Sequence, residues 1–190
     1  LVTAPLLKHF TSPKYAGLLE YGGEYGGAYL LRRGLFMPWE LPEVLDSELV
    51  KEGWEELKSM SNLRQSISGL RDPRLIVSSL EITWYMRNQL LRDTDWSSMA
   101  HSLEVRVPLV DIELLRTVAH LVNNGTPPNK RDMAMTPRKQ LPASVLDRRK
   151  TGFSIPVQQW LLESLGSEFP SVGRGLRSWA QFLHQHAAKA

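Results

Sequence analysis

Apolar residues in the middle of the chain recur every three or four positions, the spacing that puts side chains on one face of an α-helix. The clearest run follows Asp72 and Pro73, an aspartate suited to an N-cap before a proline suited to the first helical turn. This face continues over about five turns, so the pattern predicts a long helix. Its apolar positions are Leu75, Ile76, Leu80, Thr83, Met86, Leu90 and Leu91.

Shorter segments with helical spacing lie at Ser47–Leu57, 111–124, 156–165 and 176–188. Gly53 is expected to interrupt or weaken the first of these, and Asp111 is a suitable N-cap for the second. The segment 103–107 alternates as a strand would, but it runs directly into Pro108. Because strand signals are otherwise almost absent, the sequence predicts an all-α, mostly helical fold.

The first 34 residues have no sustained periodicity and contain a tandem repeat, Glu20-Tyr21-Gly22-Gly23 followed by Glu24-Tyr25-Gly26-Gly27. Glycine pairs of this kind are typical of turns, so we expect a loop here. A glycine-rich loop can also cradle phosphate, but no Lys-Ser or Lys-Thr pair follows this one. We therefore expect a loop-rich, glycine-containing connector at residues 1–40 and a helical domain at residues 41–190.

The composition suits one globular domain, since 42% of the 190 residues are hydrophobic. The chain has no cysteine, which excludes disulfides and thiolate metal sites. No apolar stretch approaches the roughly 20 residues needed to cross a bilayer, and no signal peptide is recognisable. We expect a cytoplasmic protein that does not enter the membrane. Because the chain begins with Leu1 and not with methionine, we expect it to be part of a longer protein.

Charge is unevenly distributed, although the net charge is only +3. Residues 40–56 contain seven acids and one base, whereas residues 130–150 contain seven bases and two acids. The basic run suits either solvated surface or an anionic ligand such as ATP or pyrophosphate. It is not interleaved with aromatic residues, so a nucleic-acid partner is not predicted. No metal site is predicted either, because the histidines lack further ligands at metal-binding spacing.

Two motifs stand out against this background. The first has the spacing Asp-x-x-Ser-Met-Ala-x-x-Leu-Glu-x-Arg-x-Pro-x-x-Asp over residues 95–111. The second is Arg148-Arg149-Lys150-Thr151-Gly152-Phe153-Ser154-Ile155-Pro156. Together they resemble the carboxy-terminal part of the synthetase domain of the asparagine synthetase (glutamine-hydrolysing) family. Leu109 and Val110 depart from the family's usual Phe-Leu, and Trp96 stands where the family often has a base.

This resemblance implies the carboxy-terminal helical portion of an α/β adenine-nucleotide hydrolase-like (PP-loop) synthetase domain. In the family, ATP adenylates the aspartate side-chain carboxylate, and ammonia from glutamine then forms the amide, with ATP and Mg²⁺ required. The glutaminase has a terminal cysteine nucleophile, and the PP-loop reads Ser-Gly-Gly-x-Asp-Ser. Neither is present here, since the Ser68-Gly69 pair continues as Leu70-Arg71. We expect the missing glutaminase and PP-loop portion to be partners in the same parent chain, and this fragment alone to be inactive and to bind no cofactor.

The resemblance gives the second motif a catalytic role. The family's lysine at the position of Lys150 reaches the phosphates of ATP, so Lys150 is the predicted catalytic residue. Arg149 and Gly152 are predicted to support the ATP loop, since a glycine allows close approach to the nucleotide. The alternative is that Lys150 is one more base on a basic surface.

The first motif is predicted to be structural and near the site. Glu104 and Arg106 lie two residues apart on an extended segment, where a bidentate ion pair can form. Asp95 and Asp111 are likewise predicted to shape the backbone, Asp111 as a helix cap.

Two other functions remain open at this stage. Relatives of this kind also amidate carboxylates other than aspartate, such as sugars or lactam precursors. A helical module that binds partners without catalysis is the second alternative. A surface that normally docks on the missing sheet would also favour homo-oligomers.

Overall fold

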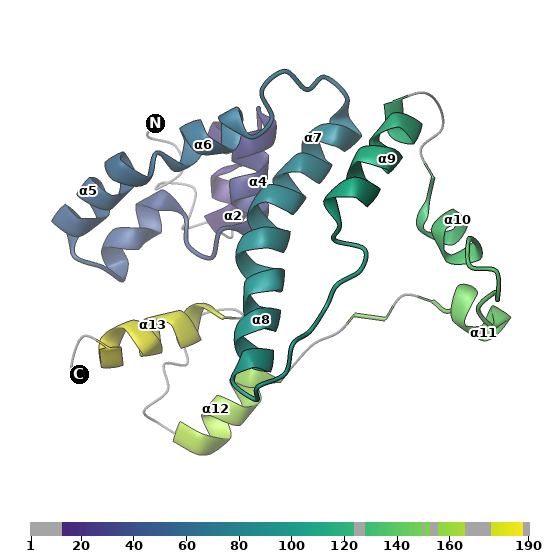
Figure 1. The fold of residues 1–190 in the computed structure, drawn as a ribbon. Coiled ribbons are helices and arrows are strands. Elements are labelled where there is room, and N and C mark those ends of the chain that lie inside the picture. The colour runs from purple at the N-terminus through teal and green to yellow at the C-terminus, as the bar shows by residue number, and fades with distance from the viewer. Residues whose placement is uncertain (1–12, 124–127, 150, 153–155, 166–175, 188–190) are drawn as a thin grey trace. The chain divides into compact units, whose positions relative to one another are not determined.

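The computed structural model describes residues 13–123, 128–149, 151–152, 156–165 and 176–187 (Figure 1). These residues form helices joined by loops, and no strand occurs among them, which confirms the predicted all-α fold. The chain divides into two compact units. Unit 1 consists of Leu1–Ser97 and Pro156–Ala190, and unit 2 of Ser98–Ile155.

Most helices belong to unit 1. Its elements are α2 (Pro13–Ala16), α3 (Leu18–Tyr21), α4 (Tyr25–Arg33), η1 (Pro38–Glu43), α5 (Ser47–Leu57), α6 (Ser59–Gln65), α7 (Pro73–Leu80), η2 (Glu81–Leu91), most of α8 (Arg92–Met99), α12 (Val157–Leu165) and α13 (Arg177–Ala187). Unit 2 contains α9 (Ile112–Asn123), α10 (Lys130–Met135) and α11 (Ala143–Leu146).

The long helix predicted from the apolar pattern is present and extends through α7, η2 and α8 (Figure 1). It begins as expected, because the Asp72 carboxylate accepts hydrogen bonds from the backbone N–H groups of Arg74 and Leu75, both at 2.9 Å. The backbone stays right-handed helical at the junction residues Glu81 and Arg92. The middle segment η2 is a π-helix, a wider winding that the spacing of apolar residues did not predict.

The core of unit 1 forms where α4, α6 and α7 meet. Its buried side chains are Tyr29, Leu63, Ile76 and Leu80. Leu30, Met60, Ile67 and Trp84 are partly buried and pack against this cluster. The core thus joins residues that lie up to about fifty positions apart in the sequence.

The loop expected over the first 34 residues is wrong where the structure describes them, because α2, α3 and α4 form there. Gly26 and Gly27 lie buried within α4. A Cβ atom on Gly26 would lie 3.3 Å from Leu63 Cβ, and one on Gly27 would lie 2.2 Å from the Tyr21 carbonyl oxygen. These glycines therefore allow close packing, and this packing outweighs their low helix propensity. The proposed division of the chain at residue 40 stays a prediction.

The other predicted helices are present with closely similar bounds. Helix α5 continues through Gly53 without interruption, and the Asp46 carboxylate caps it by accepting from the N–H groups of Glu48 and Leu49 at 3.0 and 3.1 Å. It ends at Lys58, whose backbone is left-handed and which directly precedes α6. Helices α6, α10, α11 and η1 were not predicted from the sequence.

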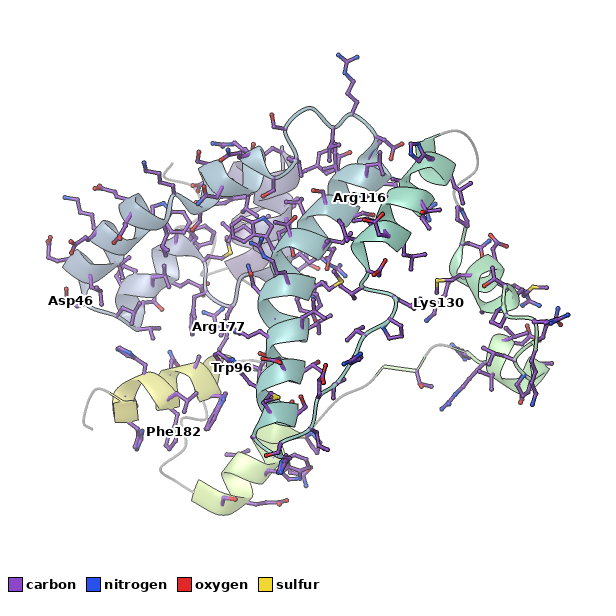
Figure 2. The ribbon with its side chains drawn as sticks, in the orientation of Figure 1. Asp46, Trp96, Arg116, Lys130, Arg177 and Phe182 are labelled. Atoms are coloured by element: carbon purple, nitrogen blue, oxygen red, sulfur yellow. The ribbon has the colours of Figure 1, made fainter. Side chains whose placement is uncertain are left out.

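Helix α13 is held to the amino-terminal part of unit 1 by a charged pair. Arg177, labelled in Figure 2, donates from its guanidinium to the carboxylate of Glu40, which is only 4% exposed. Glu40 also accepts from the backbone N–H of Met37 at 2.8 Å. The Arg177 guanidinium carbon lies 4.6 Å from the centre of the Phe36 ring. The buried carboxylate thus has two donors, and one of them comes from the last helix of the chain.

Candidate functional site

The predicted site residues are divided between the two units. Asp95 lies in α8 of unit 1, whereas Glu104, Arg106 and Asp111 lie in the segment of unit 2 that leads to α9. Arg149 and Gly152 follow α11 in unit 2. Lys150 lies outside the described residues, as does the segment 153–155.

Glu104 and Arg106 are brought together, as the spacing suggested. Arg106 Nε donates to Glu104 Oε1 at 3.0 Å, a single hydrogen bond in place of the expected bidentate pair. The side chains are 71% and 83% exposed, so this pair contributes at most about 1 kcal/mol to stability. Both charged groups are therefore open to solvent and accessible to a ligand.

Asp111 has the predicted capping role. Its Oδ1 accepts from the backbone N–H of Leu114 at 2.8 Å, at the start of α9. The turn before it is closed by the N–H of Val110, which donates to the carbonyl of Val107 at 2.9 Å. The first motif thus includes the end of one helix, a connecting segment and the beginning of the next.

Trp96, which departs from the family pattern, has a partner one helical turn earlier. The guanidinium carbon of Arg92 lies 4.9 Å from the centre of the Trp96 ring, and the Trp96 side chain is exposed (Figure 2). This is a cation–π contact on the surface of α8. The four-residue spacing between an arginine and a tryptophan was a signal for this contact in the sequence.

An exposed ion pair that sequence analysis missed lies next to the start of the second motif. Arg131 of α10 donates to Asp147 Oδ1 at 2.5 Å, which ties α10 to the residue that follows α11. Helix α10 itself begins with a capping box. Asn129 Oδ1 accepts from the backbone N–H of Asp132 at 3.1 Å, and Asp132 Oδ2 accepts from the backbone N–H of Asn129 at 2.8 Å. Sixteen positions separate Arg131 from Asp147, so local spacing gave no sign of the pair.

The bases next to Lys150 are exposed, and Gly152 lies in open space. Both Arg148 and Arg149 are on the surface. No atom lies within 4 Å of a Cβ built on Gly152, so its glycine identity is not required by packing within the described chain. Between described residues, no hydrogen bond or ion pair joins the segment 104–111 to Arg148, Arg149 or Gly152.

The described residues contain no group of three or more His, Cys, Asp or Glu side chains arranged to hold a metal ion. The exposed guanidinium groups of Arg148 and Arg149 have the chemistry to bind phosphate oxygens. In the described part of the chain, no helix is long and apolar enough to cross a membrane.

Comparison with known proteins identifies the class to which these motifs belong. The asparagine synthase family matches residues 48–169, a range that includes both motifs. The chain therefore belongs to the asparagine synthase family.

Individual relatives agree with this assignment. A putative asparagine synthetase (glutamine-hydrolyzing) of Mycobacterium tuberculosis (strain ATCC 25618 / H37Rv) is 33% identical over 94 residues, which cover 47% of this chain. Asparagine synthetase (glutamine-hydrolyzing) 1 of Bacillus subtilis (strain 168) is 32% identical over 87 residues, or 43% of this chain. The matches span only 14% and 13% of these relatives' own lengths. No solved structure matches the chain.

Proposed function

We propose that this chain supplies one wall of the synthetase site of an ATP-dependent, glutamine-hydrolysing asparagine synthetase. The observation that carries the proposal is the family match over residues 48–169, because it encloses both the 95–111 motif and the motif around Lys150. The relatives named asparagine synthetase are much longer than the matched region. The remaining parts, a glutaminase and a PP-loop portion, would then belong to the parent protein.

The proposed reaction has two steps. An oxygen of the aspartate side-chain carboxylate attacks the α-phosphorus of ATP, and pyrophosphate leaves. Ammonia released from glutamine then attacks the activated carbonyl carbon, and AMP leaves with its bonding electrons, which gives the amide of asparagine. Negative charge develops on the α-phosphate oxygens during the first step, and a fixed cation next to them lowers the barrier.

Lys150 is the residue that we assign to this electrostatic role. The exposed Arg149 would add positive charge next to it, and Gly152 would let the backbone approach the nucleotide. Mg²⁺ would be held by acidic residues of the parent protein, because the described residues offer no suitable cluster. Glu104, Arg106, Asp95 and Asp111 would shape the neighbouring backbone.

The proposal includes the behaviour of the isolated chain. It would be inactive and bind ATP weakly, because exposed bases supply charge without an enclosing pocket. It would work in the cytoplasm within its parent protein, and its exposed apolar residues favour self-association.

The test is carboxylate-dependent exchange of labelled pyrophosphate into ATP, measured with the whole parent protein. We expect exchange with aspartate and asparagine formation once glutamine is added. Exchange with a sugar acid or a lactam precursor in place of aspartate would move the assignment to another amidotransferase. If no carboxylate supports exchange, the helical interaction module becomes the better account.

A further inference from the structure

A pocket of about 240 Å³ lies within unit 1, bounded by residues of α4, α6 and η2. None of the residues that line this pocket belongs to either motif, so the proposed synthetase function does not account for it. One wall comes from η2, the π-helical part of the long helix.

Aromatic rings form much of the wall and are held in place. Trp84 Nε1 donates to the hydroxyl of Ser66 at 2.9 Å, which fixes the indole ring. The Tyr85 ring lies 3.6 Å from the guanidinium carbon of Arg33, so its face is covered by that cation. Flat, fixed rings of this kind favour planar aromatic ligands, which pack by offset stacking or edge-to-face contact.

The cation in the pocket wall is already neutralised. Arg33 makes a fork to the Glu81 carboxylate, with Nε to Oε1 at 3.2 Å and the terminal nitrogen to Oε2 at 2.5 Å. This pair holds the pKa of Arg33 above its usual value. An anionic ligand would gain little from a guanidinium that is so engaged, so the pocket suits a neutral molecule.

Among the described residues that line the pocket, the Tyr29 hydroxyl is the one buried side-chain polar group without a hydrogen bond of normal geometry. Tyr29 is 8% exposed, and its hydroxyl is buried without a hydrogen bond of normal geometry. Arg33 and the Tyr85 backbone lie close enough to affect its pKa, and both residues also line the pocket. Burial, aided by the nearby Glu81, raises the pKa of Tyr29, so the hydroxyl keeps its proton at neutral pH. Buried polar groups normally have a partner, and a ligand acceptor would supply one here.

We propose that this pocket binds a small, neutral, fused heteroaromatic molecule whose ring nitrogen or oxygen accepts a hydrogen bond from the Tyr29 hydroxyl. Its size fits this class, because a cavity of about 150 Å³ already holds a single benzene ring. The Trp84 ring would supply the stacking surface, and the Tyr29 hydroxyl would supply the directional contact.

Two matched probes test the proposal on the 190-residue chain. Quinoline carries a ring nitrogen acceptor, whereas naphthalene has the same shape without one. Titrations would be followed by the NMR signal of the Trp84 indole N–H. We expect quinoline to bind about threefold to tenfold more tightly than naphthalene, the range that one net hydrogen bond supports. Tyr29→Phe should remove this preference and leave naphthalene binding unchanged.

A second pair of variants blocks the pocket itself. Ser59 lines it from α6, whereas Ser61 on the same helix is exposed and does not line it. Ser59→Phe should abolish binding of both probes, and Ser61→Phe should bind as the unchanged chain does. No response of Trp84 to either probe would overturn the proposal. Equal binding by Ser59→Phe and Ser61→Phe, or a quinoline preference that survives Tyr29→Phe, would also overturn it.

Discussion

Unit 1 has a hydrophobic core, whereas no described residue of unit 2 is fully buried. Large apolar side chains of unit 2, such as Leu109 and Leu121, are more than half exposed. After position 97, all residues of the family motifs except Pro156 lie in unit 2. Most of the motif residues thus lie in the unit whose described residues form no buried core. This difference predicts that packing changes in unit 1 and chemical changes in unit 2 have separable effects.

The largest effect on stability is expected from the core of unit 1. Leu80→Ala should lower the free energy of unfolding by about 2–5 kcal/mol, since Leu80 is 1% exposed and its loss leaves a cavity. Leu109→Ala, in unit 2, should change it by no more than about 0.5 kcal/mol. Urea unfolding of the two variants measures the difference. Similar losses in both would contradict the contrast between the units.

The charged pair at α13 should be next in size. Arg177→Met leaves the Glu40 carboxylate buried with one fewer donor, which should cost roughly 3 kcal/mol. Arg116→Met is the matched control, because Arg116 pairs with the exposed Glu113 in α9 (Figure 2). It should cost less than about 1 kcal/mol. Equal losses of unfolding free energy in Arg177→Met and Arg116→Met would contradict the stabilising role of the buried Arg177–Glu40 pair.

A smaller effect should distinguish the N-cap of α7 in unit 1 from the N-cap of α9 in unit 2. Asp72→Ala should cost about 1 kcal/mol in global unfolding, because its carboxylate holds two N–H groups at the start of α7. Asp111→Ala should instead speed hydrogen exchange in α9 and leave the global midpoint nearly unchanged. A midpoint shift as large as that of Asp72→Ala would show that unit 2 unfolds together with unit 1.

The smallest effect concerns high pH. Burial, followed by the adjacent Glu20 carboxylate, raises the pKa of Tyr21 from 10.0 to about 12. Below pH 10 the hydroxyl is protonated in both states, so Tyr21 makes no difference there. Between pH 10 and 12 the unfolded chain loses this proton more readily, and stability should fall as pH rises. Tyr21→Phe should reduce that fall in urea unfolding at pH 8, 9.5 and 11. An unchanged slope would contradict the assigned pKa.

Local signals predicted the helices that begin with their own caps. Asp72 and Asp111 each accept backbone hydrogen bonds where the sequence predicted an N-cap. Asp46 caps the predicted helix Ser47–Leu57 in the same way, although it was not predicted as a cap. The glycine repeat wrongly predicted a loop. Gly26 packs against Leu63, which is distant in the sequence, and Gly27 lies close to the Tyr21 carbonyl, an approach that residue spacing does not reveal.

The candidate site, like the fold, could be predicted from the sequence only in part. The Glu104–Arg106 pair could be predicted from its two-residue spacing. The Arg131–Asp147 pair could not, because the two residues are sixteen positions apart and only the fold brings them together. The predicted role of Lys150 rests on the family resemblance and not on burial or on a charge partner. A direct test must therefore act on that side chain in the whole protein.

The most direct test of the proposed chemistry is the rate of asparagine synthesis by the parent protein carrying Lys150→Ala. We expect kcat to fall by about a hundredfold or more while the fold survives, with partial glutaminase activity as the sign of an intact protein. Lys150→Arg should rescue poorly, since a guanidinium has a different reach and a planar shape. Lys139→Ala, in the same basic run, should stay near the unmodified rate. Synthesis by Lys150→Ala close to that of Lys139→Ala would contradict the account.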